Sequence, residues 1–367
     1  MNAQEARALF EQHRPMLESK GISWHTDEAR PIAYLPEGMS WQMAMDALPT
    51  LASNPNAGIP AMLTTYIDPK VFRAVFAALA IADIAGAERK IGDWAEQTYI
   101  APWVEPTGET TAYGDYNDGV TPSDINSTWP NWQQFLFQGT IDYGDLEIER
   151  MARGRINAVT EKQESRARNL NTFMNTAYAF GVAGLQNYGL TNDPLLSASL
   201  TPATKAYGGT AWQVGNVTRA TPNEIFTDIQ TLITLVVSQT QGRANMNSKM
   251  TLAVGPVSHM AITQTNSFGV NVSDLLKKNF PNLELNGMAP QYSALSSINP
   301  QGIAAGNLMQ VIVHEIEGQE TCFAGFGEKL RTFPVIRGMS SYRQKAVSGT
   351  WGTIIRFPAG IGSMVGI

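Results

Sequence analysis

The spacing of apolar residues divides the N-terminal part of the chain into two stretches. Residues 68–90 repeat apolar side chains, such as Phe72 and Phe76, at helical spacing, which predicts an amphipathic helix. Residues 1–60 have no such period apart from a short helical run, AQEARALFEQH, and Pro, Gly, Ser and Asn interrupt them often. We therefore expect an extended N-terminal arm with little core of its own.

Residues 96–143 show no helical pattern at all. Their ends, EQTYIAPWVE and NWQQFLFQGTIDY, are typical of strands, whereas the middle, TGETTAYGDYNDGVTPSDINS, is acidic and rich in turn formers. A two-stranded hairpin is only marginally stable alone in water. A loop of this length is also unusual inside a compact domain unless it is functional or packs on another chain. We therefore expect this arm to lie on a neighbouring molecule.

Tryptophan and tyrosine are concentrated in the same arm. They could form a small core under the hairpin, but these residue types are also favoured at protein interfaces. Because the arm offers little else to pack against, we predict that they form an inter-subunit contact. The residues are Tyr99, Trp103, Tyr113, Tyr116, Trp129 and Trp132.

A long helix is predicted over about residues 157–181, after a short helix, DLEIERMA, that ends at Gly154. Its C-terminal half has an apolar stripe, but its middle, TEKQESRARN, is polar on every side. A helix that is polar all round over several turns bridges packed regions instead of filling a core. The polar face that we assign to it consists of Glu161, Lys162, Arg166 and Arg168.

Helices and strands alternate over residues 200–335, and residues 331–367 are rich in strand patterns. The sequence predicts a helix capped by Thr221, a strand followed by a helix that begins at Pro256, and a short helix followed by the strand LELNGM. The runs LMQVIVHEIEG and QETCFAGF are predicted to pair around Gly318. The fold class expected is α+β.

Composition narrows the class of protein. The 367 residues are 43% hydrophobic and 16% charged, as in a folded protein, and the net charge of −6 disfavours a domain that grips nucleic acid by its phosphates. One cysteine, Cys322, excludes an intrachain disulfide. The N-terminus lacks the pattern of a signal peptide and no apolar run is long enough for a membrane span, so we expect a soluble protein.

The candidate chemistry is sparse. His314 and Glu315 begin a zinc motif whose second histidine would fall at position 318, which is glycine. His314 is therefore better interpreted as a core or interface residue. No phosphate-binding loop, dinucleotide fingerprint or nucleophile elbow occurs. We expect no catalytic, cofactor-binding or metal-binding residues, no cofactor and no enzymatic activity.

Residues 143–194, YGDLEIERMARGRINAVTEKQESRARNLNTFMNTAYAFGVAGLQNYGLTNDP, resemble tailed-bacteriophage major capsid proteins of the Hong Kong 97 type. The likeness rests on the Leu-Glu-x-x-Arg-x-x-x-Gly start, the Lys/Ala/Arg-rich stretch, the Phe-Gly exit and the Gly-Leu-x-Asn segment. The order of elements extends it over nearly the whole chain. The resemblance implies an N-terminal arm at 1–60, a peripheral domain at 61–95, 144–194 and 336–367 with a spine helix at about 157–181, an extended two-stranded loop at 96–143 and an axial domain at 195–335.

The resemblance also implies a function. The chain would be a structural protein that self-assembles into pentamers and hexamers of an icosahedral shell around double-stranded phage DNA, in the host bacterial cytoplasm. Its partners would be copies of itself, a separate scaffolding protein and a portal, with a decoration protein as a further candidate; it would not bind DNA sequence-specifically or associate with a membrane. Two alternatives remain: a bacterial nanocompartment shell of the same fold, and a cytosolic α/β enzyme with residues 96–143 as a lid.

Overall fold

The computed structural model describes residues 79–367 other than 112, 114, 116–121, 155, 216 and 298, together with residues 9, 11–13, 15 and 16. Contacts divide the chain into two units, Met1–Asp68 and Pro69–Ile367, and the second is described below. The arm predicted at residues 1–60 falls almost entirely outside the described residues, as does the start of the helix predicted at 68–90.

The prediction that this helix continues to residue 90 is wrong. Helix α4 spans Ile81–Ala85 and stops at Gly86, whose φ is +102°, a backbone conformation that favours glycine. The following residues form strand β1, Glu88–Lys90, which pairs in parallel with β14. Pairing with a distant strand therefore overrides the helical spacing in this segment.

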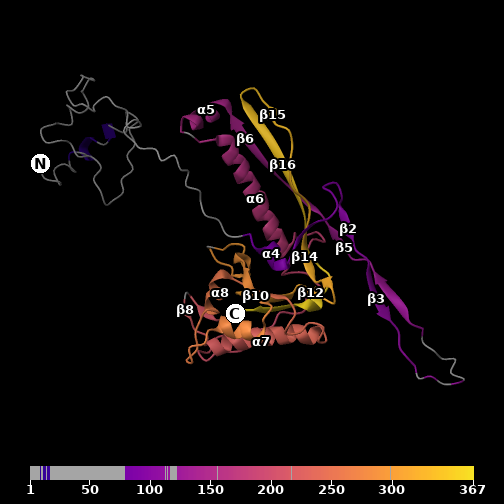
Figure 1. Ribbon diagram of the computed structural model, residues 1–367. Coiled ribbons are helices and arrows are strands. Elements are labelled where there is room, and N and C mark those ends of the chain that lie inside the picture. The colour runs from indigo at the N-terminus through magenta and orange to yellow at the C-terminus, as the bar shows by residue number, and fades with distance from the viewer. Residues whose placement is uncertain are drawn as a thin grey trace. The chain divides into compact units, whose positions relative to one another are not determined.

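Two sheets form the body of this unit (Figure 1). The first has five strands: β1, β14 (Cys322–Thr332), β16 (Ser341–Ile355), β15 (Ile336–Arg337) and β6 (Phe135–Gly144). The second has four strands in the order β10 (Leu283–Met288), β9 (Met250–Val254), β11 (Leu308–Val313) and β17 (Ile361–Val365).

The pairing predicted around Gly318 is wrong for the main strands. Only the short β12 (Glu315–Ile316) and β13 (Gln319–Glu320) pair there. Strand β11 lies between β9 and β17, which occupy both of its edges, so β14 must find its partners in the other sheet. The last strand, β17, also joins the four-stranded sheet, so residues 336–367 do not all return to one sheet as expected.

Helix α6, Ala158–Phe180, packs across β6 and β16 (Figure 1). The Asn157 side chain accepts a hydrogen bond from the Thr160 amide and caps its first turn. Helix α5, Asp145–Arg153, precedes it and ends at Gly154 as predicted. The helix predicted at about 157–181 is therefore present, and its orientation decides what its polar residues contact.

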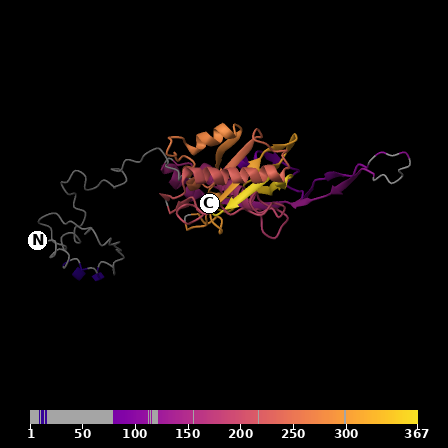
Figure 2. The same ribbon diagram turned by 90° about the horizontal axis from the view of Figure 1, so that it is seen from below.

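The four-stranded sheet carries a large core. Helix α7, Pro222–Gln239, begins at the predicted Thr221 cap and buries Ile229 and Leu232 against β11 and β17 (Figures 1 and 2). The remaining elements around this sheet are α8 (Pro256–Ala261), α9 (Val272–Asn279), β7 (Gln213–Val214), β8 (Val217–Thr218) and the short 3₁₀ turns Pro290–Tyr292 and Pro358–Gly360.

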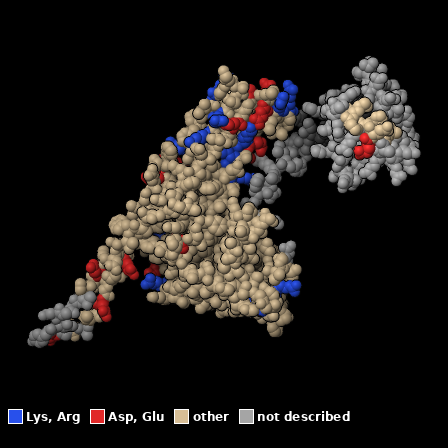
Figure 3. Space-filling model, turned by 180° about the vertical axis from the view of Figure 1, so that it is seen from behind, with Lys and Arg blue, Asp and Glu red and all other residues tan. Residues whose placement is uncertain are grey.

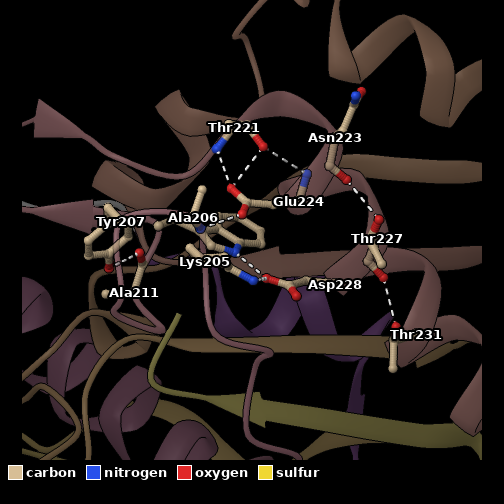
Figure 4. Close-up of polar contacts among 11 residues, drawn as sticks. Lys205, Ala206, Tyr207, Ala211, Thr221, Asn223, Glu224, Thr227, Asp228 and Thr231 are labelled. Carbon is tan, nitrogen blue, oxygen red and sulfur yellow. Dashed lines mark hydrogen bonds and ion pairs between the residues drawn. The ribbon is translucent and has the colours of Figure 1, made fainter.

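A buried ion pair holds the segment before α7 against that helix (Figure 4). Lys205 Nζ lies 2.5 Å from Asp228 Oδ2, and Trp212 Nε1 donates to the same oxygen at 2.7 Å. The Lys205 and Asp228 side chains are only 1% and 4% exposed. Glu224 also accepts a hydrogen bond from the Ala206 amide. The segment is thus fixed by charge as well as by apolar packing.

Candidate assembly surface

The predicted arm is a narrow two-stranded structure that projects from the body (Figures 1 and 2). At its base β2, Thr98–Ile100, pairs with β5, Asn131–Gln133. Further out β3, Trp103–Thr107, pairs with β4, Asp124–Thr128. Neither β3 nor β4 pairs with any other strand among the described residues. Within the described ranges, this outer part therefore has no third strand beside it.

One face of the outer arm is apolar. The register places Val104 opposite Ser127 and Pro106 opposite Ile125, and directly opposed residues share a face. Val104 and Ile125 are 61% and 63% exposed. We call Val104, Pro106 and Ile125 the arm stripe. Trp129 and Ile100, nearer the base, are also well exposed, so apolar surface continues along the arm.

The predicted aromatic interface is corrected at the base of the arm. Trp132 is 3% exposed because it packs within its own chain: its ring lies 5.6 Å from that of Tyr99, which lies 6.2 Å from that of Trp351. Trp103 is half-buried against the same cluster, which also contains Phe323. The interface prediction is therefore wrong for Trp132, and Tyr99 and Trp103 are largely used inside the subunit.

The outer aromatic residues behave differently. Trp129 is 64% exposed and Tyr113 is 93% exposed. Tyr116 lies outside the described residues. Trp129 and Tyr113 therefore stay predictions as contact residues, and the structure separates them from the aromatic cluster at the base.

A residue that is not among the predicted site residues fixes the arm to the body. Asn187 is 1% exposed, and its side-chain amide donates at 3.0 Å to both the Gln133 carbonyl of β5 and the Thr350 carbonyl of β16. The turn that presents it requires Gly181, whose φ is +65° and where a Cβ would lie 2.2 Å from the Asn187 carbonyl oxygen. The sequence signal for Asn187 is the Gly-Leu-x-Asn segment at residues 184–187, in which it is the asparagine.

Two of the four residues of the predicted polar face of α6, Lys162 and Arg166, bind groups of their own chain. Lys162 forms an ion pair with Glu147 at 2.6 Å and donates to the Asp142 carbonyl. Arg166 donates to the backbone carbonyl and the side chain of Gln344 on β16 and is 6% exposed; burial lowers its pKa. The predicted open polar face is therefore wrong for Arg166 and largely so for Lys162.

Arg168 is exposed and Glu161 is half-buried, so these two residues remain predictions as part of a polar face. Charged side chains gather at the end of the unit that carries α5, β15 and the start of β16, whereas the rest of this face carries few charges (Figure 3). There Arg343 binds both carboxylate oxygens of Asp142 at 2.8 Å, which lowers the pKa of Asp142.

The described residues hold no obvious reaction centre. His314 lies between β11 and β12, its Nε2 is 2.6 Å from Thr251 Oγ1, and burial lowers its pKa. Cys322 is buried, and burial raises the pKa of its thiol to about 12. The described part of the chain brings no three metal-binding side chains together. None of its helices has the length and apolarity needed to cross a membrane.

Comparison with known proteins identifies relatives. Residues 50–366 match the model of a family described as Pa193 gp26 major capsid protein. No curated protein matches the sequence. The capsid of Myoviridae phage XM1 is similar in structure, with a TM-score of 0.68 at 14% identity, covering 84% of this chain and 99% of that one.

Two further solved structures share the fold. Mycobacterium phage Ogopogo gives a TM-score of 0.53 at 12% identity, covering 83% of this chain and 98% of the other. The capsid of an empty GTA particle gives 0.52 at 9% identity, covering 83% and 96%. At these identities the likeness establishes the fold alone, which is the α+β capsid fold predicted from the sequence.

Proposed function

Because the chain belongs to the Pa193 gp26 major capsid protein family, we propose that it assembles into pentamers and hexamers of an icosahedral shell that encloses double-stranded DNA. The chain is a structural capsid protein with the fold of phage capsids. The observation that best supports assembly through the arm is the exposed apolar surface at Val104, Ile125 and Trp129.

The arm stripe gives this proposal its physical basis. A two-stranded ribbon is marginally stable alone, and exposed apolar side chains gain about 25 cal/mol for each Å² that is removed from water. Contact with a second copy supplies that burial. A projecting arm and its receiving surface are different patches, so the contact is heterologous, and contacts of this type close into rings.

The remaining parts of the proposal follow from the family. A shell subunit acts by packing and not by catalysis, so we propose that the protein has no enzymatic activity. Its partners would be further copies of itself, a scaffolding protein, a portal and a decoration protein. Assembly would occur in the host bacterial cytoplasm, and the finished place of the protein would be the virion capsid. The net charge of −6 suits a wall that contains DNA without gripping its phosphates.

The two alternatives have less support. A match to a major capsid protein family over most of the chain favours a phage shell over a bacterial nanocompartment. An enzyme with residues 96–143 as a lid would need a concave site under the arm, but the arm projects away from the body (Figure 1).

Removal of the outer arm tests the proposal. The variant replaces residues 104–127 with two glycines, so that the β2–β5 base and its aromatic cluster, including Trp103, remain. Negative-stain electron microscopy of the intact chain, expressed alone and with its neighbouring phage genes, is expected to show closed particles or ring-shaped capsomers. The shortened chain is expected to unfold at the same urea concentration as the intact subunit but to form neither.

Two results would count against the proposal. A small dispersed species from the intact chain under every condition would overturn the shell function. Normal particles from the shortened chain would leave the shell function standing and would exclude the arm as the essential contact.

A further inference from the structure

One strand of the arm joins the body through a single residue. Strand β5 of the arm ends at Gln133 and strand β6 of the body begins at Phe135, so Gln134 alone lies between them. On the other side of the arm, residues 91–97 separate β1 from β2. The Gln134 backbone amide donates to the Gln97 carbonyl at 3.0 Å and ties the two connections together. The conformation of Gln134 therefore bears on the direction in which the arm leaves the body.

The Gln134 side chain lies in a slot formed by two glycines, Gly327 on β14 and Gly349 on β16. A Cβ at Gly327 would overlap Gln134 Nε2, and a Cβ at Gly349 would lie 2.6 Å from the same atom. Any side chain at position 327 would take the place of the glutamine amide. The slot therefore exists because two neighbouring strands both carry glycine at this level.

A β-bulge opens the slot on the β14 side. Phe326 pairs with Thr350 and Glu328 pairs with Gly349, so Gly327 is an extra residue with no partner on β16. Bulges bend a strand and re-aim its side chains, and they are frequent next to functional sites. The φ of Gly327 is not positive, so its backbone conformation suits other residues as well. What requires glycine there is the space that the glutamine amide occupies.

The amide in this slot is held by shape alone. Both Gln134 Nε2 and Gln134 Oε1 are buried, and neither has a hydrogen-bond partner among the described residues. Buried polar groups are nearly always hydrogen-bonded, and leaving one unpaired costs stability. An apolar side chain of the same length would fill the slot without that cost. Positions that break a local rule in this way are expected to serve function.

The two preceding residues hold the arm to the body by other means. Trp132 is buried in the aromatic cluster at the arm base. The Gln133 amide donates to the Gln186 carbonyl at 2.8 Å, and its carbonyl accepts from the Asn187 side chain. Three consecutive residues thus bind the body, the first by apolar burial, the second by hydrogen bonds and the third by the fit of a side chain. Gln134 is the last of them before the body sheet begins.

We infer that Gln134 is a positioning residue for assembly: its side chain, seated between Gly327 and Gly349, sets the direction of the arm relative to the body. The inference rests on the proposed shell function for the use that is made of the arm. A small rotation at the root of a long arm moves β3 and β4 by a much larger distance. An arm whose direction is fixed before contact also loses less freedom on assembly, which favours binding.

Three variants and a control separate direction from stability. Gly327→Ala expels the amide, and the fold should remain because the overlapping atom ends a flexible side chain and the next group, the Asp93 carbonyl oxygen, would lie 3.4 Å away. Gln134→Ala empties the slot without a clash, and Gln134→Met fills it without an amide. The control is Gly144→Ala at the far end of β6, where a Cβ would lie 3.6 Å from the Ser340 carbonyl oxygen.

The direction of the arm can be measured in the unassembled subunit. Spin labels are placed at Asn126→Cys on β4 and Thr140→Cys on β6, both exposed positions, whereas the native Cys322 is buried and takes no label. Double electron–electron resonance then gives the distance between the labels. We expect the same narrow distance distribution for the unsubstituted chain, Gln134→Met and Gly144→Ala. A shifted distribution is expected for Gly327→Ala and a broader one for Gln134→Ala.

Urea unfolding and electron microscopy complete the test. Gln134→Met is expected to unfold at a higher urea concentration than the unsubstituted chain and to form the same particles, whereas Gly327→Ala is expected to lose closed particles. Unchanged distance distributions in both Gly327→Ala and Gln134→Ala would overturn the positioning role. Normal particles from a Gly327→Ala chain whose distance had shifted would overturn its importance for assembly.

The inference and the proposed function can fail separately. Failure of the unsubstituted chain to form shells under every condition would overturn the shell function. The distances measured in free subunits would still decide whether Gln134 sets the direction of the arm.

Discussion

The four-stranded sheet and the two-stranded arm differ in how far they bury their apolar side chains. Around the sheet, α7 and β11 bury Ile229, Leu232 and Val311 completely, and even the charged Lys205 and Asp228 are paired inside. Along the arm, Val104 and Ile125 are more than half exposed. One region closes its core within the chain, while the other leaves apolar surface and unpaired strand edges exposed among the described residues.

The difference shows how stability and assembly are separated in one subunit. Substitutions of buried residues around the four-stranded sheet should change the free energy of unfolding, because these side chains pack inside the subunit. Substitutions on the arm should change assembly with little effect on that free energy. The aromatic cluster at the arm base lies between the buried core and the exposed arm. Substitutions there therefore test which residues stabilise the subunit and which act in assembly.

The largest effect is expected from Asp228→Ala. It leaves the buried Lys205 ammonium without its partner, and breaking a buried pair in this way costs about 4 kcal/mol of unfolding free energy. Urea unfolding of the unassembled subunit measures it. The double variant Lys205→Met with Asp228→Leu removes both charges and is expected to recover most of the loss. A loss below about 1 kcal/mol for Asp228→Ala would mean that water already reaches the pair.

Two tryptophans three residues apart give the next largest contrast. Trp132→Ala removes a buried ring beside Tyr99 and Trp351 and is expected to cost about 3 kcal/mol of unfolding free energy. Trp129→Ala removes an exposed ring, so its cost should stay within about 0.5 kcal/mol while particle yield falls sharply. Urea unfolding and electron microscopy of both variants decide the matter. If both variants lost the same unfolding free energy, Trp129 would have to be treated as a core residue like Trp132, and the distinction between core and contact surface at the arm base would be wrong.

Local elements could be predicted from the sequence, because their signals are local. Thr221 and Pro256 mark helix starts at which the structure has α7 and α8, and Gly154 ends α5 as expected. These features depend on residues within a few positions of each other. The capsid fold itself was predicted by resemblance to a family and not by periodicity.

Long-range partners could not be predicted in the same way. Trp132 was assigned to an interface because nothing nearby in sequence could cover it, yet Trp351 does so from the far end of the chain. Arg166 was assigned to an open polar face because helical spacing cannot reveal that Gln344 lies opposite. The prediction that β11 pairs with β14 failed because β9 and β17 occupy both edges of β11.

The smallest effect on the unfolding free energy is expected at His314, which directly follows the end of β11. His314 lies there between Thr251 and Gly86, where a Cβ would come 2.7 Å from its Nδ1. Burial lowers the pKa of His314, repulsion from Lys249 adds to this, and Glu284 opposes it. The folded state therefore prefers the neutral ring.

The sign of the pH dependence follows from that preference. An unfolded histidine has a pKa of about 6.5, so the stabilisation by neutral His314 is fully present above that pH. It is lost as the pH falls through the lowered pKa of the folded state, because the unfolded chain then binds more protons. His314→Gln is expected to flatten the fall in unfolding free energy below about pH 6.5. If the unfolding free energy of His314→Gln fell with pH as steeply as that of the unsubstituted chain, the loss of stability in acid would come from a group other than His314.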